Sequence, residues 1–140
     1  MSVGITVIDK LSIASDLSNL SLVEGLVDKV CASLSIDEDL YGNILIAVTE
    51  AVNNAIIHGN KFSTDLQVLI DVLEDEQSFL FRITDFGSGF DFENLPDPTA
   101  PENIEKENGR GIFLIKNLSD NLEFSEGGKV ATILFNKDNA

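Results

Sequence analysis

The segment TEAVNNAIIHGN (residues 49–60) places Glu50, Asn53, Asn54 and His58, the only histidine of the chain, in one of its most apolar neighbourhoods. Glu50 and Asn54 are four residues apart and share one face of a predicted helix, with Asn53 a little to one side. Apolar residues surround nearly the whole circumference of that helix, so it is expected to be buried on most sides. Burying an unpaired carboxylate costs several kcal/mol, so this polar patch requires a cavity, a ligand or internal partners.

Two interpretations of the patch are open on this helix alone. In the first, Glu50 caps a neighbouring loop or pairs with a basic side chain, and the asparagines bond to backbone. In the second, the patch is a Mg²⁺ and general-base site, since an asparagine oxygen is a hard ligand of the kind that Mg²⁺ accepts. A carboxylate one turn earlier could then orient or deprotonate an attacking hydroxyl or water.

The composition indicates one soluble domain over residues 1–140, with 44% hydrophobic residues and enough length for a core. The 24 acidic residues against 9 basic ones give a net charge of -15, which opposes binding to nucleic acid or to an anionic membrane. A phosphate ligand would therefore bring a metal cation with it. Cys31 has no partner for an intramolecular disulfide. With no secretion signal and no membrane-spanning run, the chain is predicted to be cytoplasmic.

Hydrophobic periodicity along the rest of the chain predicts an α+β fold. A helix over residues 17–34 is expected after an N-cap at Ser15 or Asp16, and a second helix over residues 37–57 stops at Gly59. Strands are predicted at residues 5–13, 66–74, 79–84, 122–125 and 130–136, and a short third helix at residues 109–118. Strands joined directly as hairpins imply a two-layer sandwich, a largely antiparallel mixed β-sheet with about three helices on one face.

The motif DFGSGF (residues 85–90) directly follows a predicted strand. Its DFG triplet does not indicate a two-lobed protein kinase, because the chain has no VAIK-type lysine, no HRD loop and too little length. As a DxGxG pattern, it offers Asp85 as an acceptor for the exocyclic amine of adenine, with Gly87 and Gly89 letting a flat ring approach the backbone. Guanine presents a carbonyl there and would be repelled. Alone, the pattern is more typical of a turn.

A third motif, NGRGIFL (residues 108–114), sets Gly109 and Gly111 at the start of the short third helix. Exposed backbone N–H groups and the helix dipole at such a position favour phosphate oxygens, and Arg110 can add positive charge. A glycine pair that opens a helix is also common for steric reasons alone. The three motifs together carry more information than any one of them.

In this order and spacing, ExxxN on a helix, DxGxG after a strand, and GxG opening a later helix resemble the GHKL ATP-binding superfamily with its Bergerat fold, over nearly the whole chain. EAVNNAIIHG (residues 50–59) is similar to the EAVxNAxxHG N-box of the anti-sigma factor serine/threonine kinases. The resemblance implies ATP and Mg²⁺ as cofactors. It also implies roles for individual residues: Glu50 as catalytic base, Asn54 as Mg²⁺ ligand, Asp85 as adenine-reading acid, Gly87 and Gly89 as the first glycine box, and Gly109 and Gly111 as the second.

Other positions follow the family pattern less closely. Asn53 occupies a variable position of the N-box, where it is expected to line the pocket. The usual GTT motif before the last strand is replaced by GGKVATILF, whose nearest equivalent makes Thr132 the expected nucleotide contact. His58 fits the N-box but is expected to be a structural hydrogen-bonder. Residues 91–108, rich in proline and acid, correspond to the ATP lid.

The resemblance predicts an ATP- and Mg²⁺-dependent serine/threonine protein kinase of the anti-sigma type. Such a protein phosphorylates an antagonist protein on serine and sequesters a sigma factor or similar regulator, and the family pattern also implies a homodimer. One alternative is a non-catalytic ATP-binding module that switches partners. Another is a stand-alone ATPase domain like that of histidine kinases, which the chain length and the lack of a preceding helix pair with a phosphoacceptor histidine disfavour.

Overall fold

The computed structural model describes residues 5–88 and 107–137, so most of the predicted lid, residues 91–108, lies outside the described residues. Its elements follow the predicted order closely. Along the chain they are β1 (Thr6–Ala14), η1 (Leu17–Asn19), α1 (Leu20–Ser33), α2 (Glu38–Asn54), η2 (Ala55–Gly59), β2 (Gln67–Glu74), β3 (Ser78–Thr84), α3 (Glu107–Leu118), β4 (Asn121–Ser125), η4 (Glu126–Gly128) and β5 (Val130–Asn136).

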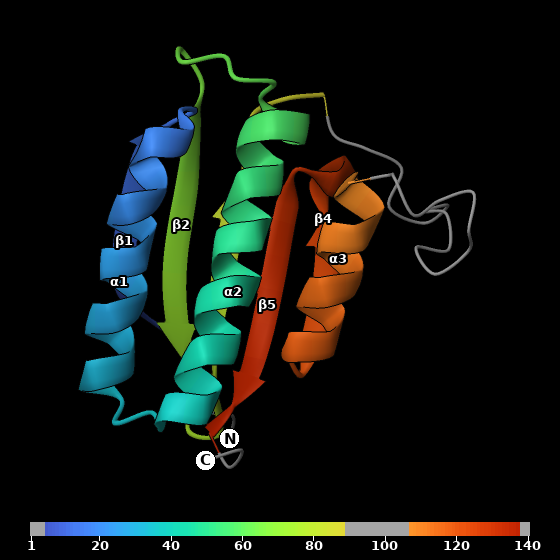
Figure 1. Cartoon of the computed structure of the whole chain (residues 1–140). Coiled ribbons are helices and arrows are strands. Elements are labelled where there is room, and N and C mark those ends of the chain that lie inside the picture. Colours follow the sequence, from blue (N-terminus) through green and yellow to red (C-terminus); the bar gives the residue numbers. More distant parts are fainter. Residues whose placement is uncertain (1–4, 89–106, 138–140) are drawn as a thin grey trace.

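The five described strands form one sheet in the order β1-β2-β3-β5-β4, and each neighbouring pair is antiparallel. The helices α1, α2 and α3 lie side by side on one face of this sheet, with α2 in the middle (Figure 1). This arrangement confirms the predicted α+β two-layer sandwich. The sheet is antiparallel throughout the described residues, without the parallel pair that a mixed sheet would contain.

The core lies between the sheet and the helices because alternate residues of each central strand point toward the helices. In β3 these residues are Phe79, Phe81 and Ile83, and β5 adds Ile133 and Phe135, all with 2% exposure or less. The rings of Phe79 and Phe135 stack with centroids 5.5 Å apart. Burial of each such side chain stabilises the fold by about 1.5–3 kcal/mol, so this aromatic cluster fixes the sheet beneath α2.

Helix α2 begins next to the predicted start at residue 37, where Asp37 caps it: the backbone N–H of Leu40 donates to Asp37 Oδ1 at 2.9 Å. It ends in a π-helical turn, η2, closed by the N–H of Asn60 donating to the Ala55 carbonyl at 2.8 Å. The expectation that the helix is buried on most sides is wrong in part, since Ile46 is 45% exposed. A solvent-facing side therefore exists, and Glu50 is half-buried beside it.

The segment Glu38–Gly59 is long and apolar enough to cross a membrane by length and composition. In the structure its apolar side is instead the core face of α2, and the buried residues are Leu40, Ile44, Ala47, Val48, Ala51 and Val52. The segment is therefore the central core helix of the sandwich.

The turn after β1 differs in detail from the predicted N-cap. Asp16 accepts from the backbone N–H of Ser18 at 2.9 Å and so caps the short η1 helix, ahead of α1. Ser15 is buried and does not cap a helix; its hydroxyl donates to the Leu66 carbonyl at 2.6 Å. Ser15 thus joins the end of β1 to the start of β2, close to the candidate site.

Candidate functional site

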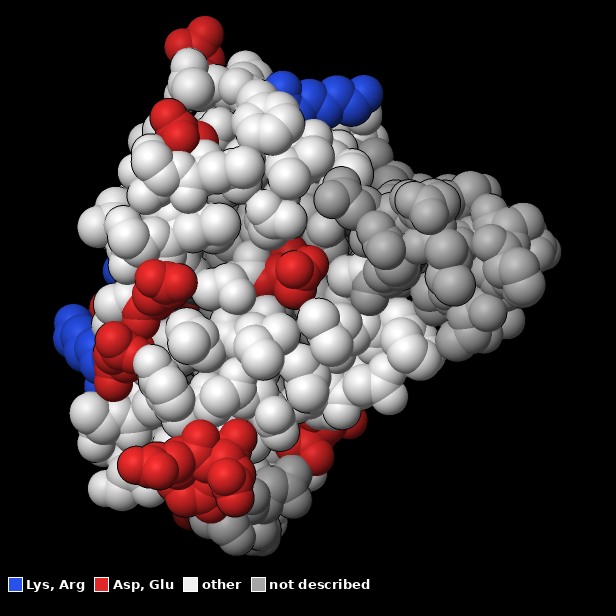
Figure 2. Space-filling model, viewed as in Figure 1, with Lys and Arg blue, Asp and Glu red and all other residues white. Residues whose placement is uncertain are grey.

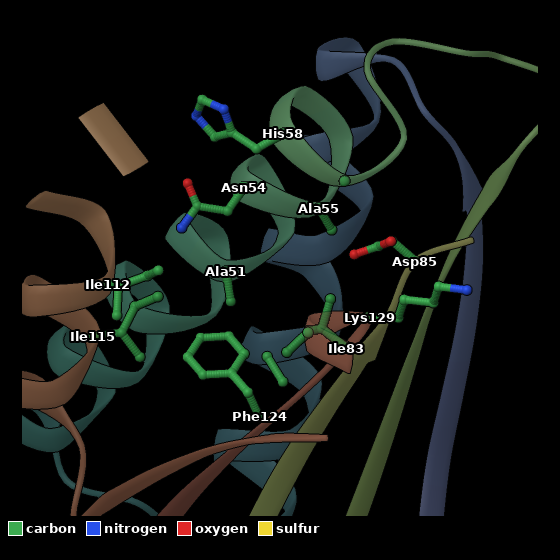
Figure 3. A pocket seen from close by; sticks show the side chains of 13 residues that line it. Ala51, Asn54, Ala55, His58, Ile83, Asp85, Ile112, Ile115, Phe124 and Lys129 are labelled. Carbon is green, nitrogen blue, oxygen red and sulfur yellow. The ribbon is translucent and has the colours of Figure 1, made fainter. Parts of the chain in front are cut away.

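A pocket lies near the C-terminal end of α2, where that helix meets α3 and residues of β3, β4 and β5 (Figure 3). Its apolar lining comes from Ala51, Ala55, Ile83, Ile112, Ile115, Phe124 and Ala131. Its polar and charged side chains are those of Asn54, His58, Asp85 and Lys129. A largely apolar pocket with a few polar groups suits a flat, mostly apolar ring that carries its own hydrogen-bonding edge.

Asp85 follows β3 directly and is the one carboxylate in this pocket among the described residues, with 6% of its surface exposed. Its backbone N–H donates to the Lys129 carbonyl at 2.9 Å, and the N–H of Gly87 donates to Asp85 Oδ1 at 3.0 Å. Burial raises the pKa of the Asp85 carboxyl, while the Gly87 N–H and the Lys129 charge act in the opposite direction. A buried carboxylate of this kind is stabilised by a ligand that donates a hydrogen bond to it.

The turn that carries Asp85 packs directly on the end of the α2–η2 helix. A Cβ added to Gly87 would lie 1.8 Å from the carbonyl oxygen of Gly59, and one added to Gly59 would lie 2.5 Å from Asp85 Cγ. Neither position can hold a side chain without movement of the backbone or of the Asp85 carboxylate. Gly59, predicted only as a helix stop, therefore also makes room for Asp85.

Glu50, Asn54 and Gly111 come together where α2 faces the start of α3. A Cβ added to Gly111 would stand 2.8 Å from Glu50 Oε2 and 3.2 Å from Asn54 Nδ2. Glu50 is thus at the α2–α3 contact outside the pocket lining, whereas Asn54 belongs to the lining. The structure thus brings the N-box and the second glycine motif together, although Asn54 and Gly111 are 57 residues apart in the sequence.

Asn54 and His58 are one helical turn apart, and their side chains lie on the same side of the helix (Figure 3). The imidazole of His58 is exposed at the mouth of the pocket. Within residues 5–88 and 107–137, the imidazole makes no hydrogen bond of the structural kind that was expected for it. His58 is instead part of the pocket lining.

Three residues that were expected in the site do not line the pocket or lie outside the described residues. Asn53 is half-buried on α2 and is not among the residues that line the pocket. Thr132 pairs with Arg82 and Glu123 on the sheet face turned away from the helices, and its neighbour Ala131 lines the pocket in its place. The expectation of a Thr132 contact is therefore corrected, because adjacent strand residues face opposite sides. Gly89 lies outside the described residues.

Gly109 and Arg110 lie in the first turn of α3, as the motif predicts. Sequence reasoning missed Phe124 and Lys129, which reach the pocket from β4 and from the turn before β5. Phe124 is one apolar residue in a short strand of alternating apolar and polar residues, and Lys129 follows two glycines in a turn. Neither sequence pattern distinguishes a pocket residue from a surface residue.

Asn60 was also missed, although it closes the opening segment of the sequence. It is 3% exposed, its Oδ1 accepts from the backbone N–H of Phe86 at 2.8 Å, and its Nδ2 donates to Ser15 Oγ at 2.9 Å and to the Gln67 carbonyl at 3.1 Å. The one sequence signal is an amide side chain directly after the glycine that ends the helix. Such a signal is weak because asparagine is common at that position for local reasons.

The donor set fits a nucleotide better than a protein-only metal centre. Among residues 5–88 and 107–137, no group of three or more His, Cys, Asp and Glu side chains could hold a metal ion. A Mg²⁺ ion takes most of its ligands from phosphates and water when it accompanies a nucleotide, so a single Asn54 oxygen suffices on the protein side. Gly59 leaves space beside the Asp85 carboxylate, and Gly111 leaves space beside the Glu50 carboxylate and Asn54.

Comparison with known proteins identifies the family. The model of the histidine kinase-like ATPase domain matches residues 13–135. The serine-protein kinase RsbW of Listeria monocytogenes serovar 1/2a is 30% identical over 122 residues, which cover 81% of this chain and 74% of that protein. The serine-protein kinase RsbW of Staphylococcus aureus strain JH9 is 36% identical over 93 residues, which cover 59% of this chain and 57% of that protein.

A crystal structure of the RsbU and RsbW domains of Rv1364c from Mycobacterium tuberculosis shares the fold, with a TM-score of 0.61 and 15% identity. The match covers 92% of this chain but only 31% of that longer chain. The ATPase-domain model spans most of the sequence, and the Listeria relative agrees with it. The chain therefore belongs to the histidine kinase-like ATPase domain family, within the GHKL superfamily, and its relatives include the serine-protein kinases RsbW.

Proposed function

We propose that this protein is an ATP- and Mg²⁺-dependent serine/threonine protein kinase of the anti-sigma type. It transfers the γ-phosphoryl group of ATP to a serine of an antagonist protein, and it sequesters a sigma factor or similar regulator. The observation that carries the proposal is the contact of Glu50 with Gly111 next to Asn54, because a module that only binds ATP does not need a carboxylate there.

The base end of the nucleotide belongs in the pocket of Figure 3. Asp85 accepts a hydrogen bond from the exocyclic amine of adenine, and this bond offsets the burial that raises the pKa of its carboxyl. The apolar walls from α2, α3 and β4 contact the faces of the ring. Gly87, packed on Gly59, keeps the Asp85 turn clear of side chains.

The phosphate end belongs at the contact of α2 and α3. Asn54 would hold Mg²⁺ through Oδ1, and the first turn of α3, which contains Gly109 and Arg110, would bind phosphate oxygens through its free backbone N–H groups. Gly111, in the next turn, leaves room beside Glu50 and Asn54. Gly89 completes the first glycine box by motif. The chain carries a net charge of -15, so the bound cation also lowers the repulsion between protein and phosphates.

Glu50 would act on the incoming serine. Bound MgATP supplies the phosphoryl group, whose bond to ADP breaks as the bond to the serine oxygen forms. The carboxylate of Glu50 orients the serine hydroxyl and takes its proton, a role worth about 10²–10⁴-fold in rate for a positioned base. Its half-buried place on the solvent-facing side of α2 leaves it within reach of a partner protein.

The wider setting follows from the same proposal. Residues 1–140 act as one kinase domain, residues 91–108 serve as its ATP lid, and the protein works in the cytoplasm as a homodimer. Acidic clusters, separated by uncharged surface, mark the helical face (Figure 2). This surface opposes nucleic acid and anionic membranes, which leaves proteins as its partners.

Glu50→Gln tests the kinase assignment. ATP affinity, measured by calorimetry with Mg²⁺, should stay within a fewfold of the wild-type value, whereas phosphoserine on a candidate antagonist should fall by roughly 10²-fold or more. Glu38→Gln, an exposed acid in the first turn of the same helix, is the matched control and should leave both quantities unchanged. If the wild type binds ATP and its antagonist but forms no phosphoserine, the protein is the non-catalytic partner switch.

A further inference from the structure

We infer that Asn60 is the positioning residue that sets base specificity, because its side chain fixes the turn that carries Asp85. The inference rests on the proposed function, in which Asp85 reads adenine. Asn60 is not itself among the residues that line the pocket, and its side chain acts through the backbone of residue 86.

The hydrogen bonds of Asn60 allow only one orientation of its amide. The N–H of Phe86 is a donor, so the atom that faces it must be the carbonyl oxygen. The Gln67 carbonyl is an acceptor, so the atom that faces it must be the NH₂ group. The amide therefore connects the Asp85 turn to the start of β2, and through Ser15 to the end of β1.

The main chain is consequently held both before and after the α-carbon of Asp85. Its N–H donates to the Lys129 carbonyl, and the next N–H, that of Phe86, donates to Asn60. These two bonds hold the main chain at Asp85, and the N–H of Gly87, two residues along the same turn, donates to Oδ1 and holds the carboxylate itself. The carboxylate then presents an acceptor at a constant place, which favours a base with an amine at that edge over one with a carbonyl.

The chain around Asn60 is strained in a way that fits this role. Lys61 and Phe62 both have left-handed backbone angles, with φ of 51° and 61°, a conformation that residues with side chains rarely adopt. The Phe62 N–H donates to the Ile56 carbonyl and the Ser63 N–H to the Asn60 carbonyl, so the turn folds back tightly on the helix end. Strain of this kind persists where surrounding contacts hold it and is concentrated at functional sites.

Asn60→Ala tests the inference through the preference for ATP over GTP. A general loss of stability would weaken the binding of both nucleotides and would not change this preference. Calorimetry with Mg²⁺ gives the ratio of the GTP and ATP dissociation constants for each variant. The wild type should prefer ATP, and Asn60→Ala should lower the ratio by roughly tenfold. Ser15→Ala is the matched control, because it removes the partner on the far side of the same amide and should leave the ratio within about twofold while lowering stability.

Hydrogen exchange of the wild-type protein gives a test that needs no variant to fold. The Phe86 amide should be strongly protected although the residue is 51% exposed, because its N–H donates a hydrogen bond to Asn60 Oδ1. A Phe86 amide that exchanges like an open loop, or an Asn60→Ala protein with wild-type base preference, overturns the inference alone. A wild type that does not prefer ATP over GTP overturns the Asp85 assignment together with it, whereas lost phosphoryl transfer with intact preference overturns only the kinase proposal.

Discussion

The α-carbon of Gly87 lies so close to the carbonyl of Gly59 that a Cβ at position 87 would stand 1.8 Å from its oxygen. Gly87→Ala therefore has to displace backbone, since both contacting groups are main-chain atoms. We expect the free energy of unfolding to fall by about 1–3 kcal/mol and ATP affinity to fall by roughly tenfold or more as the Asp85 turn moves. Denaturant unfolding and calorimetry measure the two effects.

The controls for that change are Gly25→Ala in α1 and Gly42→Ala in α2. A Cβ at either position meets nothing within 4 Å, and alanine favours a helix over glycine by about 0.5–1 kcal/mol. Both variants should be more stable than wild type with unchanged ATP affinity. Equal losses in all three variants would contradict the close-packing explanation for Gly87.

Gly111→Ala should separate chemistry from folding. Its new methyl group would meet the ends of the Glu50 and Asn54 side chains, 2.8 Å and 3.2 Å away, and these ends can swing aside. Stability should therefore stay close to wild type, while the rate of phosphoryl transfer falls by up to about 10²-fold because the base is misplaced by the order of 1 Å. Single-turnover phosphorylation of the antagonist and thermal unfolding give the two readouts; an unchanged rate would count against Glu50 as base.

Asp85→Asn should bind ATP more weakly yet show a stability advantage that grows with pH. Burial raises the pKa of the folded carboxyl above the ordinary value of 3.8, so the folded chain holds this proton more tightly than the unfolded chain does. The stability from this group is thus fully present below pH 3.8 and is lost as pH rises through the folded pKa. Asparagine does not ionise, so the unfolding free energy of the variant should rise relative to wild type across that window.

Urea unfolding at a series of pH values measures this difference directly. Asp65→Asn changes an exposed carboxylate and provides the control. If Asp85→Asn binds ATP as tightly as the wild type does, Asp85 is not part of the nucleotide site. A variant whose relative stability falls with pH would contradict the raised pKa.

Cys31 should be inert in the folded protein. Its thiol is buried in α1, and burial, with a smaller contribution from Asp28, raises its pKa to about 11. At pH 7 roughly one molecule in 10⁴ then carries the thiolate, which is the reactive form. Labelling with a thiol reagent should proceed slowly without denaturant and quickly after unfolding, and fast labelling of the native protein would show that α1 opens readily.

Much of the fold could be predicted because local signals and tertiary packing agree. The strands β2 and β3, the start of α2 near residue 37 and the stop at Gly59 each appear in the structure near the expected residue. The exposed side of α2 was not predicted, because an apolar residue such as Ile46 gives the same pattern whether it is covered or not. Exposure depends on neighbouring helices, which periodicity does not reveal.

The motifs singled out Asn54 and Asp85, which the structure places in the pocket lining, and Glu50, which it places beside Asn54, while their roles stay predictions. The candidate site was not predictable where position depends on strand facing or on distant partners. Thr132 and Ala131 differ by one residue, and only the register of β5 decides which of them reaches the pocket. The bonds of Asn60 extend to Ser15 and Phe86, 45 and 26 residues away, so its role follows from the tertiary structure alone.

Helix α2 supplies the central core face and, on its other sides, Glu50 and Asn54. A substitution in this helix therefore alters folding and ligand recognition at once, so few substitutions there can change the ligand preference alone. The turn before β5 and the short strand β4, which contribute Lys129 and Phe124 to the pocket, are less buried than the core face of α2. Divergence in ligand preference among descendants of this protein should accordingly begin at that edge of the sheet, while the helix at the centre changes last.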